Sequence, residues 1–260
     1  MRDIRKEIQE KLQEIEAREN VQIILAVESG SRAWGFASPD SDYDVRFIYV
    51  RSREDYLKLN PYKDVIEWQL DEVLDINGWD LKKALEQFHR SNTTLFEWSN
   101  SPLVYKKTVL WEEIYERAMI YFAEKLAIYH YYGTAKSTYE GYLCGEQVKY
   151  KKYFYALRPL LACKYIEQYH KMPPVLFEEL LHLDLEEELR RQINKLLEVK
   201  KATQEKDLRP HIPGIMAFIR SELEKQKQIV AGMKDDRRLE WDTLNEIFQD
   251  VLSRQKARKL

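Results

Sequence analysis

The chain has 260 residues, of which 44% are hydrophobic and 33% charged, with eight glycines and eight prolines. This balance excludes a disordered chain and predicts a folded, helix-rich protein with one large domain or two moderate ones. The formal net charge of -2 gives the whole chain no attraction for phosphate backbones, so a nucleic acid would have to meet a local basic patch.

Cys144 and Cys163 are the only cysteines, too few for a disulfide framework, and residues 1–20 are densely charged and do not resemble a secretory signal. No apolar run approaches the ~18 residues of a membrane span. We therefore expect a soluble cytoplasmic protein without a membrane partner. Its oligomeric state stays open, because the helical stripes could face a core or a second subunit.

The first part of the chain alternates helix and strand patterns. Apolar residues at helical spacing predict an amphipathic helix that ends near Asn20. Short β-branched and apolar runs then predict strands at residues 21–27, 43–50, 65–70 and 72–76. A helix with Asp80 at its N-cap should follow and reach about Asn92.

The second part of the chain shows helical stripes from about Thr108 onward. Loops are indicated at residues 171–174 and 203–214, where prolines and charges cluster. We expect a catalytic domain over residues 1–105 and a helical domain over residues 106–260.

Asp42 and Asp44 stand two residues apart at the start of a predicted strand, so both side chains project from the same face. Two adjacent like charges repel unless a cation compensates them, and Mg²⁺ commonly binds one or two carboxylates together with substrate phosphates. An isolated Asp-x-Asp is more often an exposed turn, as the neighbouring serines and proline also suggest.

Gly30 and Ser31 lie where the first strand ends and a helical turn begins. There, backbone N–H groups and the serine hydroxyl can bind phosphate oxygens. A Gly-Ser pair alone is usually an ordinary turn. The order strand, Gly-Ser, short helix, Asp-x-Asp and strand is much more specific than either part.

This order resembles the polymerase-beta-like nucleotidyltransferases. The strings Glu28-Ser-Gly-Ser-Arg-Ala-Trp-Gly35 and Ser38-Pro-Asp-Ser-Asp-Tyr-Asp-Val-Arg46 resemble the YcgL-type family, described as RNA-repair-pathway or RNA-ligase-associated. The resemblance covers roughly residues 21–175. It implies an α+β fold, in which a small mixed sheet with flanking helices is followed by an all-α domain; residues 176–260 receive no role.

The resemblance also implies a third carboxylate on a neighbouring strand, for which the candidates are Glu67, Asp71 and Asp75. We choose Asp75, because an acid between two apolar residues in a strand requires a reason to be there. The alternative is that Asp75 merely precedes a turn at Asn77-Gly78, since Asn-Gly is a strong turn signal.

The implied reaction transfers a nucleoside monophosphate from a nucleoside triphosphate such as ATP to a hydroxyl and releases pyrophosphate. Asp42, Asp44 and Asp75 would hold two Mg²⁺ or Mn²⁺ ions, and Asp75 could accept the hydroxyl proton. Ser31 would bind phosphates. Arg32 and Arg46 are candidate phosphate-binding groups, although structural pairing is equally compatible with the sequence.

Lys152, Tyr155 and Arg158 fall three residues apart on a predicted helix and could share one face, where they would bind the nucleotide. The alternative is a helix with buried tyrosines and a solvated lysine face. RNA is the acceptor that the resemblance implies. A protein or small-molecule acceptor, or a regulatory module that binds nucleotide or RNA without turnover, remains open.

Overall fold

The computed structural model describes residues 3–39, 41–69, 73–202 and 208–255. Contacts divide the chain into two compact units. Unit 1 consists of Met1–Ala33, Asp42–Tyr121 and Arg238–Leu260, and unit 2 of Trp34–Ser41 and Phe122–Arg237. The chain therefore crosses between the units four times, whereas the sequence analysis expected a single boundary at 105/106.

In the described part of unit 1, five strands form one mixed sheet in the order β3-β4-β2-β1-β5. The strands are β1 (Gln22–Glu28), β2 (Tyr43–Val50), β3 (Val65–Gln69), β4 (Leu74–Asp80) and β5 (Val104–Lys107). β2 and β4 run parallel, and the other neighbours are antiparallel. The α+β prediction is confirmed, and the four predicted strands overlap β1 to β4.

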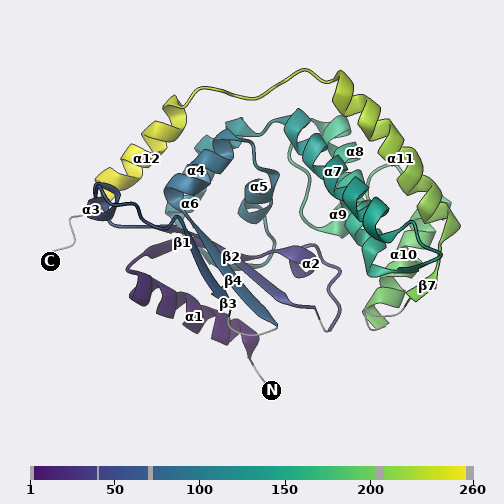
Figure 1. Ribbon diagram of the computed structural model, residues 1–260, viewed down its shortest axis with the longest axis horizontal. Helices are drawn as coiled ribbons and strands as arrows, with labels where there is room; N and C mark the ends of the chain where they lie inside the picture. Colours follow the sequence, from purple (N-terminus) through teal and green to yellow (C-terminus); the bar gives the residue numbers. More distant parts are fainter. Residues whose placement is uncertain (1–2, 40, 70–72, 203–207, 256–260) are drawn as a thin grey trace. The chain divides into compact units, whose positions relative to one another are not determined.

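Helices lie on both faces of this sheet (Figure 1). The described helices of unit 1 are α1 (Ile4–Glu19), α2 (Gly30–Ala33), α3 (Arg53–Tyr56), α4 (Leu81–His89), α5 (Thr93–Ser99), α6 (Val109–Ala118), the 3-10 helix η1 (Met119–Tyr121) and α12 (Asp242–Arg254). On α1, the apolar stripe Ile8, Leu12 and Ile15 is buried against the sheet. Asp80 caps α4 as predicted, but that helix ends at His89 and Asn92 caps the separate helix α5.

The turn at Asn77-Gly78 that was the alternative interpretation of Asp75 does not form, because both residues lie within β4. A Cβ atom on Gly78 would stand 2.1 Å from Cε2 of Phe47, the residue paired with it on β2. Glycine is therefore required at this position to leave room for the Phe47 ring, and it does not reverse the chain. The tertiary packing accounts for a residue that the local pattern assigned to a turn.

The end of the chain returns to unit 1. α12 packs against α4 and α6. The ring of Trp241 stacks on His89 with centroids 3.6 Å apart, and Arg117 pairs with Asp250 at 2.6 Å. This return explains why the expected helical domain 106–260 does not form one unit: α6 packs on β1, and η1 and α12 pack on α4 and α6.

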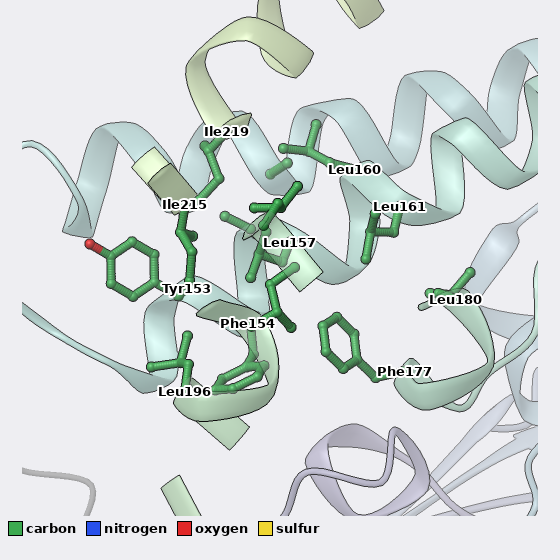
Figure 2. Packing of buried hydrophobic residues seen from close by; sticks show 14 of the residues in the cluster. Tyr153, Phe154, Leu157, Leu160, Leu161, Phe177, Leu180, Leu196, Ile215 and Ile219 are labelled. Atoms are coloured by element: carbon green, nitrogen blue, oxygen red, sulfur yellow. The ribbon is translucent and has the colours of Figure 1, made fainter. Parts of the chain in front are cut away.

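Unit 2 is mainly helical. Its elements are α7 (Glu124–Tyr142), β6 (Gln147–Lys149), α8 (Lys151–Tyr169), α9 (Phe177–Leu180), α10 (Glu187–Ala202), β7 (Leu208–Pro210) and α11 (Pro213–Gly232). Figure 2 shows its core, where Phe154 and Leu157 of α8 meet Phe177, Leu196 and Ile215 from other elements. β6 and β7 pair antiparallel, a small sheet that the helical prediction for this region missed. None of the described helices has the length and apolarity that a bilayer crossing requires.

Candidate active site

Two carboxylates meet across the parallel strands β2 and β4. The strand register pairs Asp44 directly with Asp75. Glu67, another candidate third acid, lies on β3 opposite Asn77, two residue pairs further along β4 than Asp75. Asp71 lies outside the described residues. Of the acids compared in the sequence analysis, the structure thus places Asp75 beside Asp44.

The guanidinium of Arg46 lies between these two carboxylates. Its Nη2 is 2.7 Å from Oδ2 of Asp75 and 3.2 Å from Oδ1 of Asp44. Its Nη1 also donates to the carbonyl oxygens of Val45 and Asp75. Arg46 was expected to bind a phosphate or to make a structural pair, and in this structure its contacts are those of a structural pair.

The Gly30 backbone closes the other side of the Asp44 carboxylate. Gly30 has a φ of 64°, and a Cβ atom there would stand 2.3 Å from Oδ2 of Asp44. The N–H of Ser29 donates to the carbonyl oxygen of Asp44 at 2.8 Å. Only glycine combines this left-handed conformation with so close an approach. The turn that begins α2 therefore brings Gly30 against Asp44, and Ser31 follows it on α2.

Arg32 holds the backbone at the start of β2. Its Nε donates to the carbonyl oxygen of Asp42 at 3.0 Å, and its guanidinium lies 3.6 Å from the centroid of the Tyr43 ring. The Asp42 side chain is exposed. Through these contacts Arg32 fixes the position of the segment that carries Asp42.

Glu28 supports the backbone of the site at Asp44, a role that was not assigned from the sequence. Its side chain is 0% exposed; one carboxylate oxygen accepts the N–H of Asp44 at 2.7 Å and the other accepts the hydroxyl of Tyr105. Burial raises the pKa of Glu28, while the two hydrogen bonds oppose that rise. The available signal in the sequence was an acid at the end of an apolar strand.

The electrostatics of Asp44 connect the three aspartates. Burial raises the pKa of Asp44; Arg46 opposes the rise, and the negative charges of Asp75 and Asp42 add to it. Hard carboxylate oxygens that repel one another are a donor set that suits a divalent cation. Within residues 3–39, 41–69, 73–202 and 208–255, however, no three acidic, histidine or cysteine side chains are gathered as a metal site.

Comparisons with known proteins place this arrangement in a family. The model of the RNA repair pathway DNA polymerase beta family matches residues 4–250. The chain belongs to that family. It is also 41% identical over 257 residues to the uncharacterized protein YcgL of Bacillus subtilis (strain 168), with 95% of this chain and 99% of that protein covered.

Among solved structures, the chain is similar to a nucleotidyltransferase-like protein from Exiguobacterium sibiricum, with a TM-score of 0.31 and 14% identity over 95% of this chain and 89% of that one. The family match, by contrast, runs from α1 into α12. The resemblance seen in the sequence is therefore confirmed, and it extends beyond residue 175 into the part that it had left unassigned.

The predicted helical residues of the nucleotidyltransferase site lie in unit 2. Arg158 is 4% exposed; its Nε donates to the carbonyl of Val175 and its guanidinium lies 4.6 Å from the Trp34 ring centroid. These contacts make Arg158 part of the packing of unit 2. Lys152 and Tyr155 are half-buried, with the Lys152 ammonium 5.5 Å from the Tyr155 ring.

Proposed function

We propose that the chain is a metal-dependent nucleotidyltransferase that transfers a nucleoside monophosphate from a nucleoside triphosphate to a hydroxyl and releases pyrophosphate. The observation that carries the proposal is the pairing of Asp44 with Asp75 across the parallel strands β2 and β4. Asp42 precedes Asp44 by two residues, and the Gly30 turn lies against the Asp44 carboxylate. Family membership supports the same chemistry.

The donor set suits Mg²⁺ or Mn²⁺, because it consists of carboxylate oxygens. Burial raises the pKa of Asp44, and the negative charges of Asp75 and Asp42 add to that rise. Asp42 and Asp44 would hold one ion, and Asp75 would join them around a second. When bound, the two ions stabilise the charges on the attacking and leaving oxygens of an in-line displacement.

The chain's own residues then have separate tasks. Gly30 leaves free the space that a Cβ atom would fill beside Asp44. Ser31, on the turn that follows, offers its hydroxyl and backbone N–H to the phosphates of the triphosphate. Asp75 accepts the proton of the acceptor hydroxyl. Arg32 and Glu28 keep the backbone at Asp42 and Asp44 in place through the hydrogen bonds that they make there.

RNA is the acceptor that we propose, in line with the family's description. Transfer to a protein or a small molecule would use the same carboxylates. One observation favours a different class of function: Arg46 already neutralises Asp44 and Asp75, as in a module that binds nucleotide or RNA without turnover.

The test is label transfer from each α-³²P-labelled nucleoside triphosphate in Mg²⁺ or Mn²⁺, with single-stranded RNA or protein as the acceptor. We expect labelled RNA with the natural chain and a loss of about a thousandfold with Asp44→Asn, since metal-ion stabilisation contributes several kcal/mol to such reactions. Glu67→Gln is the matched control, because Glu67 lies opposite Asn77 instead of Asp44.

Other outcomes separate the alternatives. Label on protein alone contradicts the RNA acceptor. Metal-dependent nucleotide binding without any labelled acceptor supports the non-catalytic module. If Glu67→Gln reduces transfer as much as Asp75→Asn does, Asp75 is not the third carboxylate.

A further inference from the structure

Residues 34–41 link the two halves of the candidate active site. They begin three residues after Ser31 and end directly before Asp42. Contacts assign them to unit 2, whereas Ser31 and Asp42 belong to unit 1. Peptide bonds at both ends therefore join the site to a segment that packs within unit 2. We call these residues the 34–41 segment.

Phe36 anchors the 34–41 segment in the core of unit 2. Phe36 is 1% exposed and belongs to the same core cluster as Phe154 and Phe177, which Figure 2 shows. Its ring stacks on Phe154 with centroids 5.1 Å apart and meets Phe177 edge to face at 5.7 Å. A close-packed ring of this size cannot shift without opening a void or moving its neighbours. Residues of α8 and α9 therefore fix the backbone at Phe36.

Two hydrogen bonds from other parts of unit 2 hold the backbone of the 34–41 segment. The N–H of Phe177 donates to the carbonyl oxygen of Trp34 at 2.9 Å. The ammonium of Lys200, on α10, donates to the carbonyl oxygen of Phe36 at 2.5 Å, and Lys200 is 5% exposed. Burial of an ammonium is costly unless hydrogen bonds compensate it, so the bond to Phe36 resists a shift of the segment. Phe177 and Lys200 thus fix two carbonyl groups of the segment.

A closed turn leaves little slack between Phe36 and Asp42. The N–H of Ser41 donates to the carbonyl oxygen of Ser38 at 3.0 Å, and the N–H of Ser38 donates to Oγ of Ser41 at 3.0 Å. Both serines are buried. Directly after Asp42 the chain enters β2 at Tyr43. A displacement of Phe36 is therefore passed along a hydrogen-bonded turn to Asp42.

We propose that Phe177 and Lys200 are positioning residues that keep Asp42 at the candidate metal site. They hold the 34–41 segment, and the segment ends at the peptide bond to Asp42. The inference rests on the proposed function for the role of Asp42 and adds the residues of unit 2 on which that role depends. Phe177 and Lys200 act on the position of the carboxylate and take no part in the chemical step.

Asp44 provides the contrast. The β2–β4 register pairs it with Asp75, and Glu28 accepts its N–H. These bonds lie within unit 1 and do not involve the 34–41 segment. If the segment were an ordinary link, the bond from Arg32 to the carbonyl oxygen of Asp42 would suffice to place Asp42. Loosening the segment would then lower the stability of unit 2 and leave the affinity for a cation unchanged.

The test measures Mn²⁺ binding to the full chain by electron paramagnetic resonance of the free ion, without nucleotide. We expect about tenfold weaker binding for Phe177→Leu and for Lys200→Met, a typical loss when the support of a metal ligand is removed. In an Asp42→Asn background the same substitutions should leave the affinity unchanged, because they act through Asp42. Equal losses in both backgrounds overturn the proposal, and so does an unchanged affinity in the natural background.

Ile166→Ala is the matched control. Ile166 is 0% exposed and lies on α8 in a different core cluster of unit 2. Its removal should lower the thermal stability and leave Mn²⁺ binding unchanged. A loss of affinity as large as that of Phe177→Leu would trace the effect to the stability of unit 2 and overturn the proposal. Thermal unfolding shows that each variant is folded, and Phe177→Leu, which keeps an apolar side chain, carries the test if Lys200→Met does not fold.

Hydrogen exchange followed by nuclear magnetic resonance separates this inference from the proposed function, because it requires neither metal nor label transfer. In Phe177→Leu and Lys200→Met, amide exchange should be about tenfold faster at Ser41 and Tyr43, while the amide of Asp44 keeps its natural rate. Faster exchange that stops at Ser41 overturns the positioning of Asp42 and leaves the transferase standing. If this exchange pattern is found and the natural chain transfers no label, the transferase is refuted and the positioning stands.

Discussion

At each end of the β2–β4 strand pair an aspartate lies near an arginine, and the two aspartates differ in how far solvent reaches their side chains. At one end, the Asp75 side chain is 48% exposed and meets Arg46. At the other, Asp80 is 0% exposed; it accepts the N–H of Lys82 at 2.8 Å and the hydroxyl of Tyr56 at 3.0 Å, with Arg51 3.8 Å away. The protein itself satisfies Asp80, whereas solvent still reaches Asp75.

This contrast separates a structural acid from acids that can take a ligand. Burial raises the pKa of Asp80 to about 6, and its remaining contacts hold a helix cap in place. Burial also raises the pKa of Asp44, but there the charges of two other aspartates contribute. A cluster of partly exposed like charges is the arrangement that a cation or a charged substrate would stabilise.

Replacement of Asp80 by Asn should give the largest change in stability. The pKa of Asp80 is raised to about 6 in the folded state, above an unfolded value of about 3.9, so the folded state binds more protons between these limits. The contribution of Asp80 to the free energy of unfolding is therefore greatest at low pH and falls as pH rises through about 6. From pH 7.5 to 4.5, the natural chain should gain about 2 kcal/mol relative to Asp80→Asn.

Urea denaturation at the two pH values measures this difference. Tyr56→Phe is the companion variant: it keeps the carboxyl group but removes a hydrogen bond that lowers its pKa, so the pH dependence should persist with a higher midpoint. If the difference in stability between the natural chain and Asp80→Asn shrinks as pH falls, the raised pKa of Asp80 is contradicted.

Tyr105→Phe tests the buried support of the site. The change leaves an oxygen of the fully buried Glu28 without the Tyr105 hydroxyl, and we expect the free energy of unfolding to fall by about 2 kcal/mol. Adding Glu28→Gln should recover part of the loss, because an uncharged side chain is less costly to bury. Strictly additive losses in this double-mutant cycle would show that the two side chains are not coupled.

Gly30→Ala tests the close approach of the Gly30 backbone to the Asp44 carboxylate, at the exposed end of the β2–β4 strand pair. The positive φ of 64° costs an alanine about 1–2 kcal/mol, and the new Cβ atom displaces the Asp44 carboxylate. Label transfer should fall well beyond what the stability loss explains. Gly133→Ala is the control: it lies in α7 with nothing within 4 Å of its Cβ position, and it should stabilise the chain by about 0.5–1 kcal/mol.

Arg46→Met should have the smallest effect of these variants, and the property that it changes should be the affinity for a divalent cation. Removal of this cation leaves Asp44 and Asp75 unneutralised, so Mn²⁺ should bind about fivefold more tightly, an effect of about 1 kcal/mol. Arg46→Lys keeps the charge and should bind Mn²⁺ as the natural chain does. Electron paramagnetic resonance of free Mn²⁺ gives both affinities, and weaker binding by Arg46→Met would mean that Arg46 organises the carboxylates for the metal.

The elements of unit 1 could be predicted in outline because the spacing of apolar residues within each element indicates which of its faces is buried. β-Branched runs identify β1 and β2, and apolar spacing identifies α1. The β6–β7 pair could not be recognised in the same way, since each strand has three residues and the partners lie about sixty positions apart. The sequence left a turn at Gly78 open as an alternative for a related reason: the residue that requires glycine there, Phe47, is remote in sequence.

The sequence by itself determined the order of strand, Gly30-Ser31, Asp42 and Asp44, and thereby the family, because these residues are close along the chain and local geometry governs their spacing. Only the tertiary structure decided the rest. The parallel register of β2 and β4 set Asp75 and not Glu67 beside Asp44, burial gave Glu28 its supporting position, and Arg46 came to lie between two carboxylates. Each of these depends on pairing between distant segments, which no local pattern records.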